Sequence, residues 1–276
     1  MDWIGVRKLA DACMCPKSLN YIIEVYSNDF EIEYSKPNSS NGEISYSEDI
    51  NFGRVAEGIL QYHATGKGKS GKNKRADEIR DWIIKLEDEF YDDDDLEYIK
   101  LDEVKSPWAR KDQWWIKNVK FTEESVNDID VFFEQWVRQF TAKNFDEMEW
   151  DYEYEISLNR PISSSKFLPV SGVMDLINHK SGTIIELKTT ALWKKDFAKL
   201  QVMIYGDLFF RKEGVRPLCY IFHDNLLSSY NFEKINSLIE EANDDDENVE
   251  PSILSCRDCL CPHCKKCLKL IEVPNT

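Results

Sequence analysis

The 276-residue sequence lacks long apolar runs and is poor in positive charge. No stretch approaches the ~18 consecutive apolar residues that a membrane span needs. The opening residues, MDWIGVRKLADACM, also lack the apolar segment of a secretory signal. Lys and Arg number 35 against 51 Asp and Glu, which gives a net charge of −16. Because non-specific affinity for phosphate comes from Lys and Arg, this balance argues against a general nucleic-acid coat protein. We therefore expect a cytoplasmic, globular protein without membrane contacts.

Eight cysteines are distributed unevenly along the chain. Cys13 and Cys15 stand near the start, Cys219 is alone, and five lie in the tail SCRDCLCPHCKKC, residues 255–267. Without an export signal, such cysteines are more often metal ligands or buried thiols than disulfides. Zinc fits the tail poorly, because its two Cys-x-x-Cys pairs are four residues apart and zinc ribbons use a longer spacer. A [4Fe-4S] cluster, which commonly takes three thiolates from a tight run and one from far away, fits better.

Residues 172–188, GVMDLINHKSGTIIELK, form the stretch around which the chain is organised. Residues 170–177 and 183–187 are apolar, β-branched runs, and the Asn-His-Lys-Ser-Gly between them supplies turn residues. We therefore predict a β-hairpin. Asp175 lies midway along its first strand, where an unpaired buried acid would be costly.

The second strand of this hairpin adds two more charged residues. Side chains alternate along a strand, so Glu186 and Lys188 point to the same face. The carboxylates of Asp175 and Glu186, with a strand carbonyl, offer Mg²⁺ or Mn²⁺ the oxygen ligands it prefers. Lys188 would then lie beside a metal-bound water and the phosphate under attack. The structural alternative is a salt bridge between Lys188 and a neighbouring carboxylate.

A helix is predicted directly after the hairpin, over residues 192–210. Gln201 and Tyr205 are four residues apart and therefore share one face of this helix. Apolar residues recur beside them at helical spacing, at Trp193, Phe197, Leu200, Ile204 and Leu208.

These motifs together resemble the RecB-like branch of the PD-(D/E)xK nuclease superfamily, which includes the iron-sulfur nucleases of CRISPR adaptation and AddB-type nucleases. The resemblance rests on an Asp, a hairpin turn, a Glu-x-Lys strand and a following Gln-x-x-x-Tyr helix. It implies a restriction-endonuclease-like α/β core that binds Mg²⁺ or Mn²⁺ and hydrolyses phosphodiester bonds. It assigns catalysis to Asp175, Glu186 and Lys188, metal binding to Asp175, Glu186 and the Leu187 carbonyl, and strand binding to Gln201 and Tyr205.

A further metal contact is implied on a helix predicted over residues 50–64. The family usually carries a Gly followed four residues later by His or Glu on this helix, and Gly53 is followed by Glu57. We assign the contact to Glu57 and hold His63 as second choice. His63 lies in the middle of the apolar stripe of this helix, so a hydrogen-bonded core histidine is the alternative for it.

The cysteine regions also resemble this family, in part. Cys15-Pro16 is similar to the family's Cys-Pro-Arg opening, although Lys17 replaces the Arg and the Tyr is displaced. The resemblance implies a [4Fe-4S] cluster that joins the two termini, with Zn²⁺ as the alternative metal. Its ligands would be Cys15, Cys256, Cys259 and either Cys264 or Cys267, and Cys261, Cys264 and Cys267 form a competing trio.

A basic loop at residues 65–75, TGKGKSGKNKR, fits most of a phosphate-binding P-loop. Asn73 stands where a metal-binding Ser or Thr belongs, and a helix instead of a strand precedes the loop, so we reject a nucleotide-binding role. The loop is expected to touch a DNA backbone or to be a solvated surface segment.

The chain therefore divides into four expected parts. Residues 1–64 hold the first cluster ligand and the first core helix, 65–150 the basic loop and a helical insertion, 151–242 the catalytic core, and 243–276 an acidic linker and the cysteine tail. The insertion is predicted to hold helices at 76–90 and 125–140, and the core to hold further strands at 152–158 and 217–222. The expected fold class is α/β, with a mixed central sheet flanked by helices.

The expected activity is that of a metal-dependent deoxyribonuclease, namely exonucleolytic cleavage of single-stranded DNA in CRISPR adaptation, recombination or repair. Cleavage of RNA or of duplex ends is the alternative among enzymes. An inactive DNA-binding or scaffold subunit of the same fold, within a complex of protein partners, is the alternative outside them. A zinc-stabilised interaction module is a third possibility.

Overall fold

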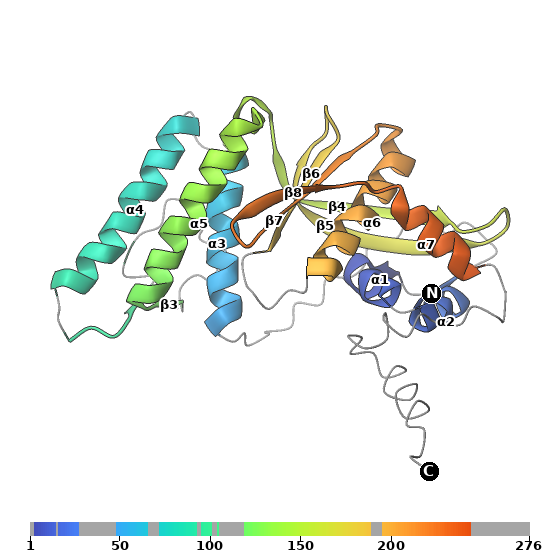
Figure 1. The fold of residues 1–276 in the computed structure, drawn as a ribbon, viewed down its shortest axis with the longest axis horizontal. Coiled ribbons are helices and arrows are strands. Elements are labelled where there is room, and N and C mark those ends of the chain that lie inside the picture. The colour runs from blue at the N-terminus through green and yellow to red at the C-terminus, as the bar shows by residue number, and fades with distance from the viewer. Residues whose placement is uncertain are drawn as a thin grey trace, which may run out of the picture.

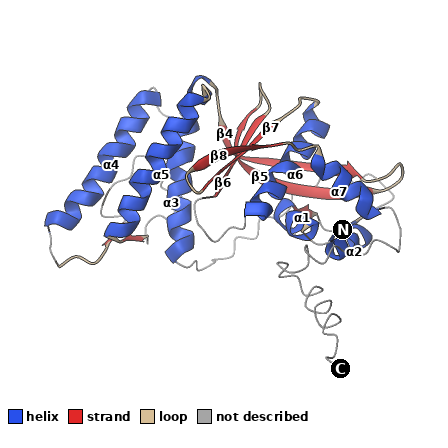
Figure 2. Cartoon of the chain, viewed as in Figure 1, coloured by secondary structure: helices blue, strands red, loops and turns tan. Residues whose placement is uncertain are grey.

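A computed structural model of the protein describes residues 3–14, 16–27, 48–65, 72–92, 95–100, 104, 119–188 and 195–243. In this part of the chain a mixed sheet is flanked by helices, which confirms the predicted α/β class (Figure 1 and Figure 2). The elements are β1 (Ile4–Gly5), α1 (Val6–Cys13), α2 (Pro16–Tyr26), α3 (Glu48–Thr65), α4 (Lys72–Asp92), β2 (Ile99–Lys100), β3 (Lys120–Phe121), α5 (Glu123–Ala142), a short 3₁₀ turn (Phe145–Glu147), β4 (Asp151–Pro161), β5 (Phe167–Asn178), β6 (Thr183–Lys188), α6 (Lys195–Glu213), β7 (Leu218–His223), β8 (Leu226–Tyr230) and α7 (Lys234–Asn243).

The main sheet is built around β5. Its strands run in the order β1-β5-β6-β7-β8, with β4 also paired to β5, while β2 and β3 form a separate small hairpin. β5 is antiparallel to β4 and β6 and parallel to β1, and β6 is parallel to β7. β4 follows β5 along nearly all its length, so β1 and β6 must share the opposite edge of β5.

This shared edge contains a gap that positions the candidate site. β1 pairs with β5 at Val170 and Ser171, and β6 pairs with it only from Leu176 to Asn178. Among the described residues, no strand pairs with residues 172–175 on that edge. We call the gap between these residues and residues 186–188 of β6 the fork.

The sheet separates two apolar clusters (Figure 1). One contains α3, α4 and α5, and the other contains α1, α2, α6 and α7. Leu187 and Phe222 face the first cluster, whereas Ile184 and Ile221 face the second, as strand alternation requires. Both faces of β6 are therefore covered, and all six of its residues are buried.

Strand β5 changes faces at Asp175. Met174 and Leu176 are two residues apart and should share a face, yet Met174 lies in the α6 cluster and Leu176 in the α3 cluster. The paired residues of β4, Tyr154 and Tyr152, make the same change. Between them Glu153 has a φ of 50°, a left-handed conformation that non-glycine residues seldom adopt. The distortion therefore lies directly opposite Asp175.

Local signals in the sequence account for several element boundaries. The Thr122 hydroxyl accepts a hydrogen bond from the Ser125 N–H and begins α5. In the β5–β6 turn, Asn178 Oδ1 accepts a bond from the Ser181 N–H, and Gly182 has a φ of 67°. Gly182 is required there because a Cβ would be strained in that conformation.

The edge strand β8 is paired by a side chain. Gln139 on α5 donates from Nε2 to the Asn225 carbonyl at 2.8 Å and accepts from the Leu227 N–H at 2.7 Å. Its amide thus acts as one residue of an additional strand. This contact joins the α5 layer to the sheet and protects part of an edge that could pair with another chain.

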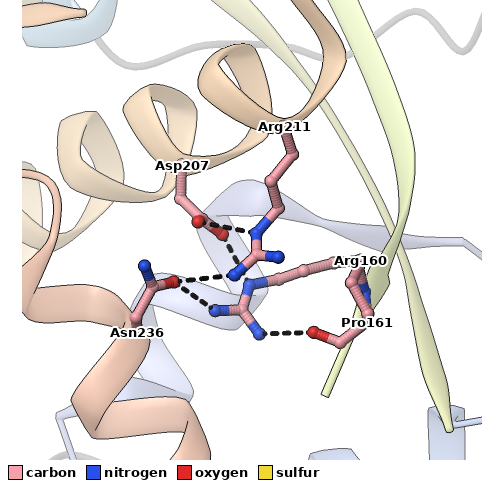
Figure 3. Close-up of polar contacts among 5 residues, drawn as sticks. All are labelled: Arg160, Pro161, Asp207, Arg211 and Asn236. Carbon is pink, nitrogen blue, oxygen red and sulfur yellow. Dashed lines mark hydrogen bonds and ion pairs between the residues drawn. The ribbon is translucent and has the colours of Figure 1, made fainter. Parts of the chain in front are cut away.

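A buried polar network joins β4, α6 and α7 (Figure 3). Arg160 donates to Asp207 Oδ2 at 2.6 Å and to Asn236 Oδ1 at 2.8 Å. Arg211 donates to the same two partners, to Asp207 Oδ1 at 2.8 Å and to Asn236 Oδ1 at 3.0 Å. Arg160 and Asp207 are each 1% exposed, so the pair is removed from solvent screening.

Most of the predicted helices and strands fall within α3, α4, α5, β4, β5 and β6, and the remaining two overlap α6 and β7. Strands β1, β2, β3 and β8 and helix α7 were not predicted. Residues 66–71 of the basic loop lie outside the described residues, as do the acidic linker and the cysteine tail from residue 244 onward. No helix in the described ranges has the length and apolarity needed to cross a membrane.

Removal of Arg160 should destabilise the fold. Arg160→Met leaves the buried Asp207 carboxylate with Arg211 alone, and we expect the free energy of unfolding to fall by about 3 kcal/mol. Urea unfolding followed by tryptophan fluorescence measures this change. Arg80→Met is the matched control, because its exposed pair with Asp77 should contribute less than about 1 kcal/mol. Equal losses in the two variants would show that the network does not hold the helices.

Candidate functional site

Three predicted residues meet at the fork. The Lys188 ammonium donates to Glu186 Oε1 at 2.5 Å and lies 4.0 Å from Asp175 Oδ2. Asp175 Oδ2 also accepts a hydrogen bond from the Leu187 N–H at 2.7 Å. A side chain of β5 thus pairs with a backbone group of β6 where the two strands no longer pair with each other. Glu186 is 1% exposed and Lys188 is 6% exposed. The hairpin therefore places two acids and one base together in a largely dry environment.

Glu57 joins this group from the opposite layer. It lies on α3, whose apolar residues belong to the cluster on the far side of the sheet from α6. Its carboxyl, when protonated, donates a hydrogen bond to Asp175, and it interacts electrostatically with Lys188 and Glu186. Gln61, one turn later on α3, donates to Glu57 Oε1 at 3.4 Å. The gap in β5–β6 pairing lets a side chain from α3 reach the site.

The two polar residues of α6 approach from the other layer. Gln201 donates from Nε2 to Glu186 Oε1 at 2.5 Å, and Tyr205 donates to the Val173 carbonyl at 2.7 Å. That carbonyl belongs to the stretch of β5 that has no strand partner at the fork. Tyr205 fits because Gly172 leaves room: a Cβ on Gly172 would lie 2.8 Å from the Tyr205 ring.

Burial and crowding of acids shift the pKa values of the site. Burial raises the pKa of Glu186 to about 8, the Asp175 carboxylate adds to the rise, and Lys188 opposes it. Burial likewise raises the pKa of Glu57 well above its ordinary value, with Asp175 as the next cause. For Lys188, burial lowers the pKa, but the attraction of Glu186 and Asp175 outweighs it and the net direction is upward. One ammonium does not balance three carboxyls.

Two buried oxygens at the site have no hydrogen-bond partner. They are Glu186 Oε2 and Gln201 Oε1. Unpaired buried acceptors are costly, and oxygen ligands with surplus negative charge suit a hard cation such as Mg²⁺ or Mn²⁺. As arranged here, however, no three His, Cys, Asp or Glu side chains of the described segments are placed to hold a metal ion. Lys188 and Gln201 both donate to Glu186 Oε1, so Oε2 is the oxygen of this carboxylate that is left for a cation.

The remaining predicted ligands lie elsewhere or are not described. His63 is buried among Phe133 and Phe140, and its Nδ1 accepts a hydrogen bond from Trp136 Nε1 at 3.2 Å. The structure thus places it in the helical core and does not bring it to the fork. The predicted cluster ligands fall outside the described residues, at Cys15, Cys256, Cys259, Cys264 and Cys267.

Sequence reasoning missed three residues that shape the site. Gly172 makes room for Tyr205, Gln61 contacts Glu57, and Arg7 of α1 lowers the pKa of Glu186. Gly172 could have been found, since a glycine inside a strand often marks a close approach of another group. Arg7 and Gln61 carry no local signal, because only the fold brings them near.

Comparisons with known proteins identify no family. No family model matches the chain, and no curated protein matches it. Among solved structures, the crystal structure of SSO0001 matches with 18% sequence identity over 50% of this chain and 70% of that chain, with a TM-score of 0.26. A similarity at that level carries no argument about fold or function.

Titration of Glu186 should make the metal-free protein less stable as pH rises. Between pH 4.5, the ordinary value, and about 8, the folded protein keeps a proton that the unfolded chain releases. The contribution of Glu186 to the free energy of unfolding therefore falls across this interval, by up to a few kcal/mol. Urea unfolding in EDTA near both ends of the interval measures it. Glu186→Gln, which has no such proton, should lose less stability than wild type over the same range; parallel curves would contradict the assignment.

Proposed function

We propose that the protein is a metal-dependent deoxyribonuclease with a RecB-like PD-(D/E)xK site. The observation that supports this most directly is the meeting of Glu57, Asp175, Glu186 and Lys188 at the fork. They come from the β5–β6 hairpin and from helix α3, which lies far from that hairpin in sequence. A purely structural ion pair would need one acid for one base, whereas this group has an excess of acids.

The excess of acids favours a divalent cation. Without one, the electrostatic cost is reduced by protonation of Glu57 and Glu186, in keeping with their raised pKa values. A cation would replace those protons and supply a partner for Glu186 Oε2. Asp175, Glu186, the Leu187 carbonyl and Glu57 would hold Mg²⁺ or Mn²⁺, provided that the Lys188 ammonium moves away from Glu186 Oε1.

The chain's own residues then have distinct roles. Lys188, released from Glu186, would stabilise the negative charge that develops on the phosphoryl oxygens. Gln201 orients the Glu186 carboxylate, and Tyr205 fixes the stretch of β5 that carries Asp175 and has no strand partner on the edge at the fork. A bound Mg²⁺ or Mn²⁺ supplies Lewis-acid polarisation of the phosphate and a water of lowered pKa.

We propose single-stranded DNA as the substrate, cleaved exonucleolytically, with RNA or duplex ends as the alternative. A negative chain needs a local cationic surface for this purpose, because phosphate affinity comes from Lys and Arg. CRISPR adaptation, recombination or repair, with protein partners, is the proposed setting.

An inactive DNA-binding or scaffold subunit is the second candidate. One observation favours it: in the described arrangement Lys188 pairs with Glu186, and no group of three potential ligands is placed to hold a metal. In such a protein the site would remain a protonated, ion-paired cluster and would only strengthen the sheet.

Substitutions at the fork should abolish cleavage. For Asp175→Asn, Glu186→Gln and Lys188→Met, we expect the rate of Mn²⁺-dependent digestion of a labelled single-stranded DNA oligonucleotide to fall by about 10³-fold or more. The measurement is the single-turnover rate with enzyme in excess.

Matched controls for that assay come from exposed positions on the same sheet. Lys180→Met in the β5–β6 turn and Glu155→Gln on β4 should keep the wild-type rate, because both residues are exposed and neither is at the fork. A folded wild type that binds DNA but cleaves no single-stranded DNA, duplex or RNA would favour the scaffold.

The proposed [4Fe-4S] cluster makes its own prediction. Protein purified without oxygen should be brown and contain iron and acid-labile sulfide, and Cys15→Ser or Cys259→Ser should lower both. Cys13→Ser and Cys219→Ser are the controls, because both thiols are buried within the fold and burial raises the pKa of each to about 12. A colourless protein that contains zinc would contradict the cluster proposal and favour the zinc alternative.

A further inference from the structure

Helix α4 lies farthest from the main sheet in the layer that contains α3, and α5 packs beside it (Figure 1). A shallow hollow of 10 Å³ is lined by Glu87, Phe90 and Tyr91 from the last turns of α4 and by Glu123, Val126 and Asn127 from the first turns of α5. Farther from this hollow, Arg80 of α4 interacts electrostatically with Asp130 of α5. The two helices are therefore antiparallel. Their outward surface forms a groove between helices, on which a third helix can pack.

Large apolar side chains are exposed on this outward surface. On α4, Ile84 is 51% exposed and Tyr91 is 76% exposed, and on α5 Val131 is 52% exposed. Ile84 and Tyr91 are seven residues apart, so they lie two turns apart on one side of α4. Val131 belongs to the matching part of α5, because its neighbour Asp130 interacts with Glu87, which lies between the two α4 residues. We call Ile84, Tyr91 and Val131 the outer stripe.

Acidic residues surround the outer stripe. Beyond the first five residues of α4, this helix and α5 together contain 12 Asp and Glu but only three Lys and Arg. Burial raises the pKa of Glu87, with the Asp130 and Asp88 carboxylates as further causes. Burial also raises the pKa of Asp130, and Glu134 adds to the rise. Like charges from the two helices thus repel one another across the groove, and cations placed between them would reduce that repulsion.

We infer that the outer stripe and the acids around it bind a basic amphipathic helix of a protein partner. The apolar face of such a helix covers the stripe, and its flanking Lys and Arg meet carboxylates such as Glu87 and Asp130. The charge of the surface selects this occupant, because a second copy of the chain or a nucleic-acid strand would bring like charges together. The inference does not depend on the proposed nuclease activity, since neither α4 nor α5 contributes a residue to the fork.

Binding of a designed helical peptide tests the inference. The probe is a fluorescein-labelled peptide of about 18 residues, with Leu at helical spacing on one face and Lys and Arg on both flanks of that face. The control peptide has the same composition in an order that breaks the apolar face. Fluorescence anisotropy at physiological salt gives the dissociation constants, and we expect the amphipathic peptide to bind about tenfold more tightly than the control. Equal affinities would show attraction by charge alone and would overturn the inference.

Substitutions on the surface show where the peptide binds. The double variant Ile84→Gln with Val131→Gln should bind it about tenfold more weakly, because the apolar contacts are lost. Glu87→Gln with Asp130→Asn should also weaken binding and should reduce its dependence on salt. Leu218→Gln is the matched control, because Leu218 of β7 is likewise 52% exposed but lies outside the two helices. It should keep the wild-type affinity.

Three further results would overturn the inference. The first is no binding of the amphipathic peptide at about 100 µM protein. The second is wild-type affinity in both double variants. The third is a wild-type dimer in light scattering that Ile84→Gln with Val131→Gln converts to a monomer, because the occupant would then be a second copy of the chain. Digestion of single-stranded DNA in Mn²⁺ by the same variants, which should proceed at the wild-type rate, decides the proposed nuclease separately.

Discussion

The balance between one buried ammonium and the carboxyls around it is the constraint on which the fork depends. The Lys188 ammonium donates its short hydrogen bond to Glu186. Asp175 and Glu57 lie nearby as well, so the group contains more acids than bases. Burial makes every unpaired charge in this group costly. The neighbouring elements reduce that cost by donating to it: α6 provides an amide, and β6 provides a backbone N–H. The packing of helices on the sheet is thus tied to the electrostatics of the site.

The interrupted pairing between β5 and β6 is what allows a polar group between two apolar layers. A continuous ladder would separate the two layers, whereas the gap lets Glu57 approach from the α3 side a site whose Glu186 faces α6 and Gln201. The backbone groups exposed by the gap still need partners. Two of them have side-chain partners, because the Leu187 N–H donates to Asp175 and the Val173 carbonyl accepts from Tyr205. The residues that hold the fork open are therefore also the candidate site.

Local periodicity was sufficient to predict the hairpin and the helix after it, because alternation and a helical stripe are properties of neighbouring residues. Gln201 and Glu57, two positions that the resemblance named, lie near Glu186 and Asp175 in the structure. The change of face at Asp175 was not predictable, since it depends on a left-handed Glu153 on another strand. The Gln139 amide on the edge of β8 and the Arg160–Asp207 pair were missed for the same reason: their partners are 86 and 47 residues away.

Helix α6 shows how the distant contacts and the site depend on each other. Gly206 lets this helix lie against the sheet, because a Cβ there would be 2.5 Å from Cys219 Sγ of β7. One residue later, Asp207 is fixed by Arg160 of β4. The close approach to β7 and the ion pair with β4 together fix where α6 lies on the sheet. From there Gln201 Nε2 donates to Glu186 Oε1 at 2.5 Å, on β6, which lies between β4 and β7 in the sheet. A small residue and a buried ion pair, neither of which touches the fork, thereby determine where the site's amide donor lies.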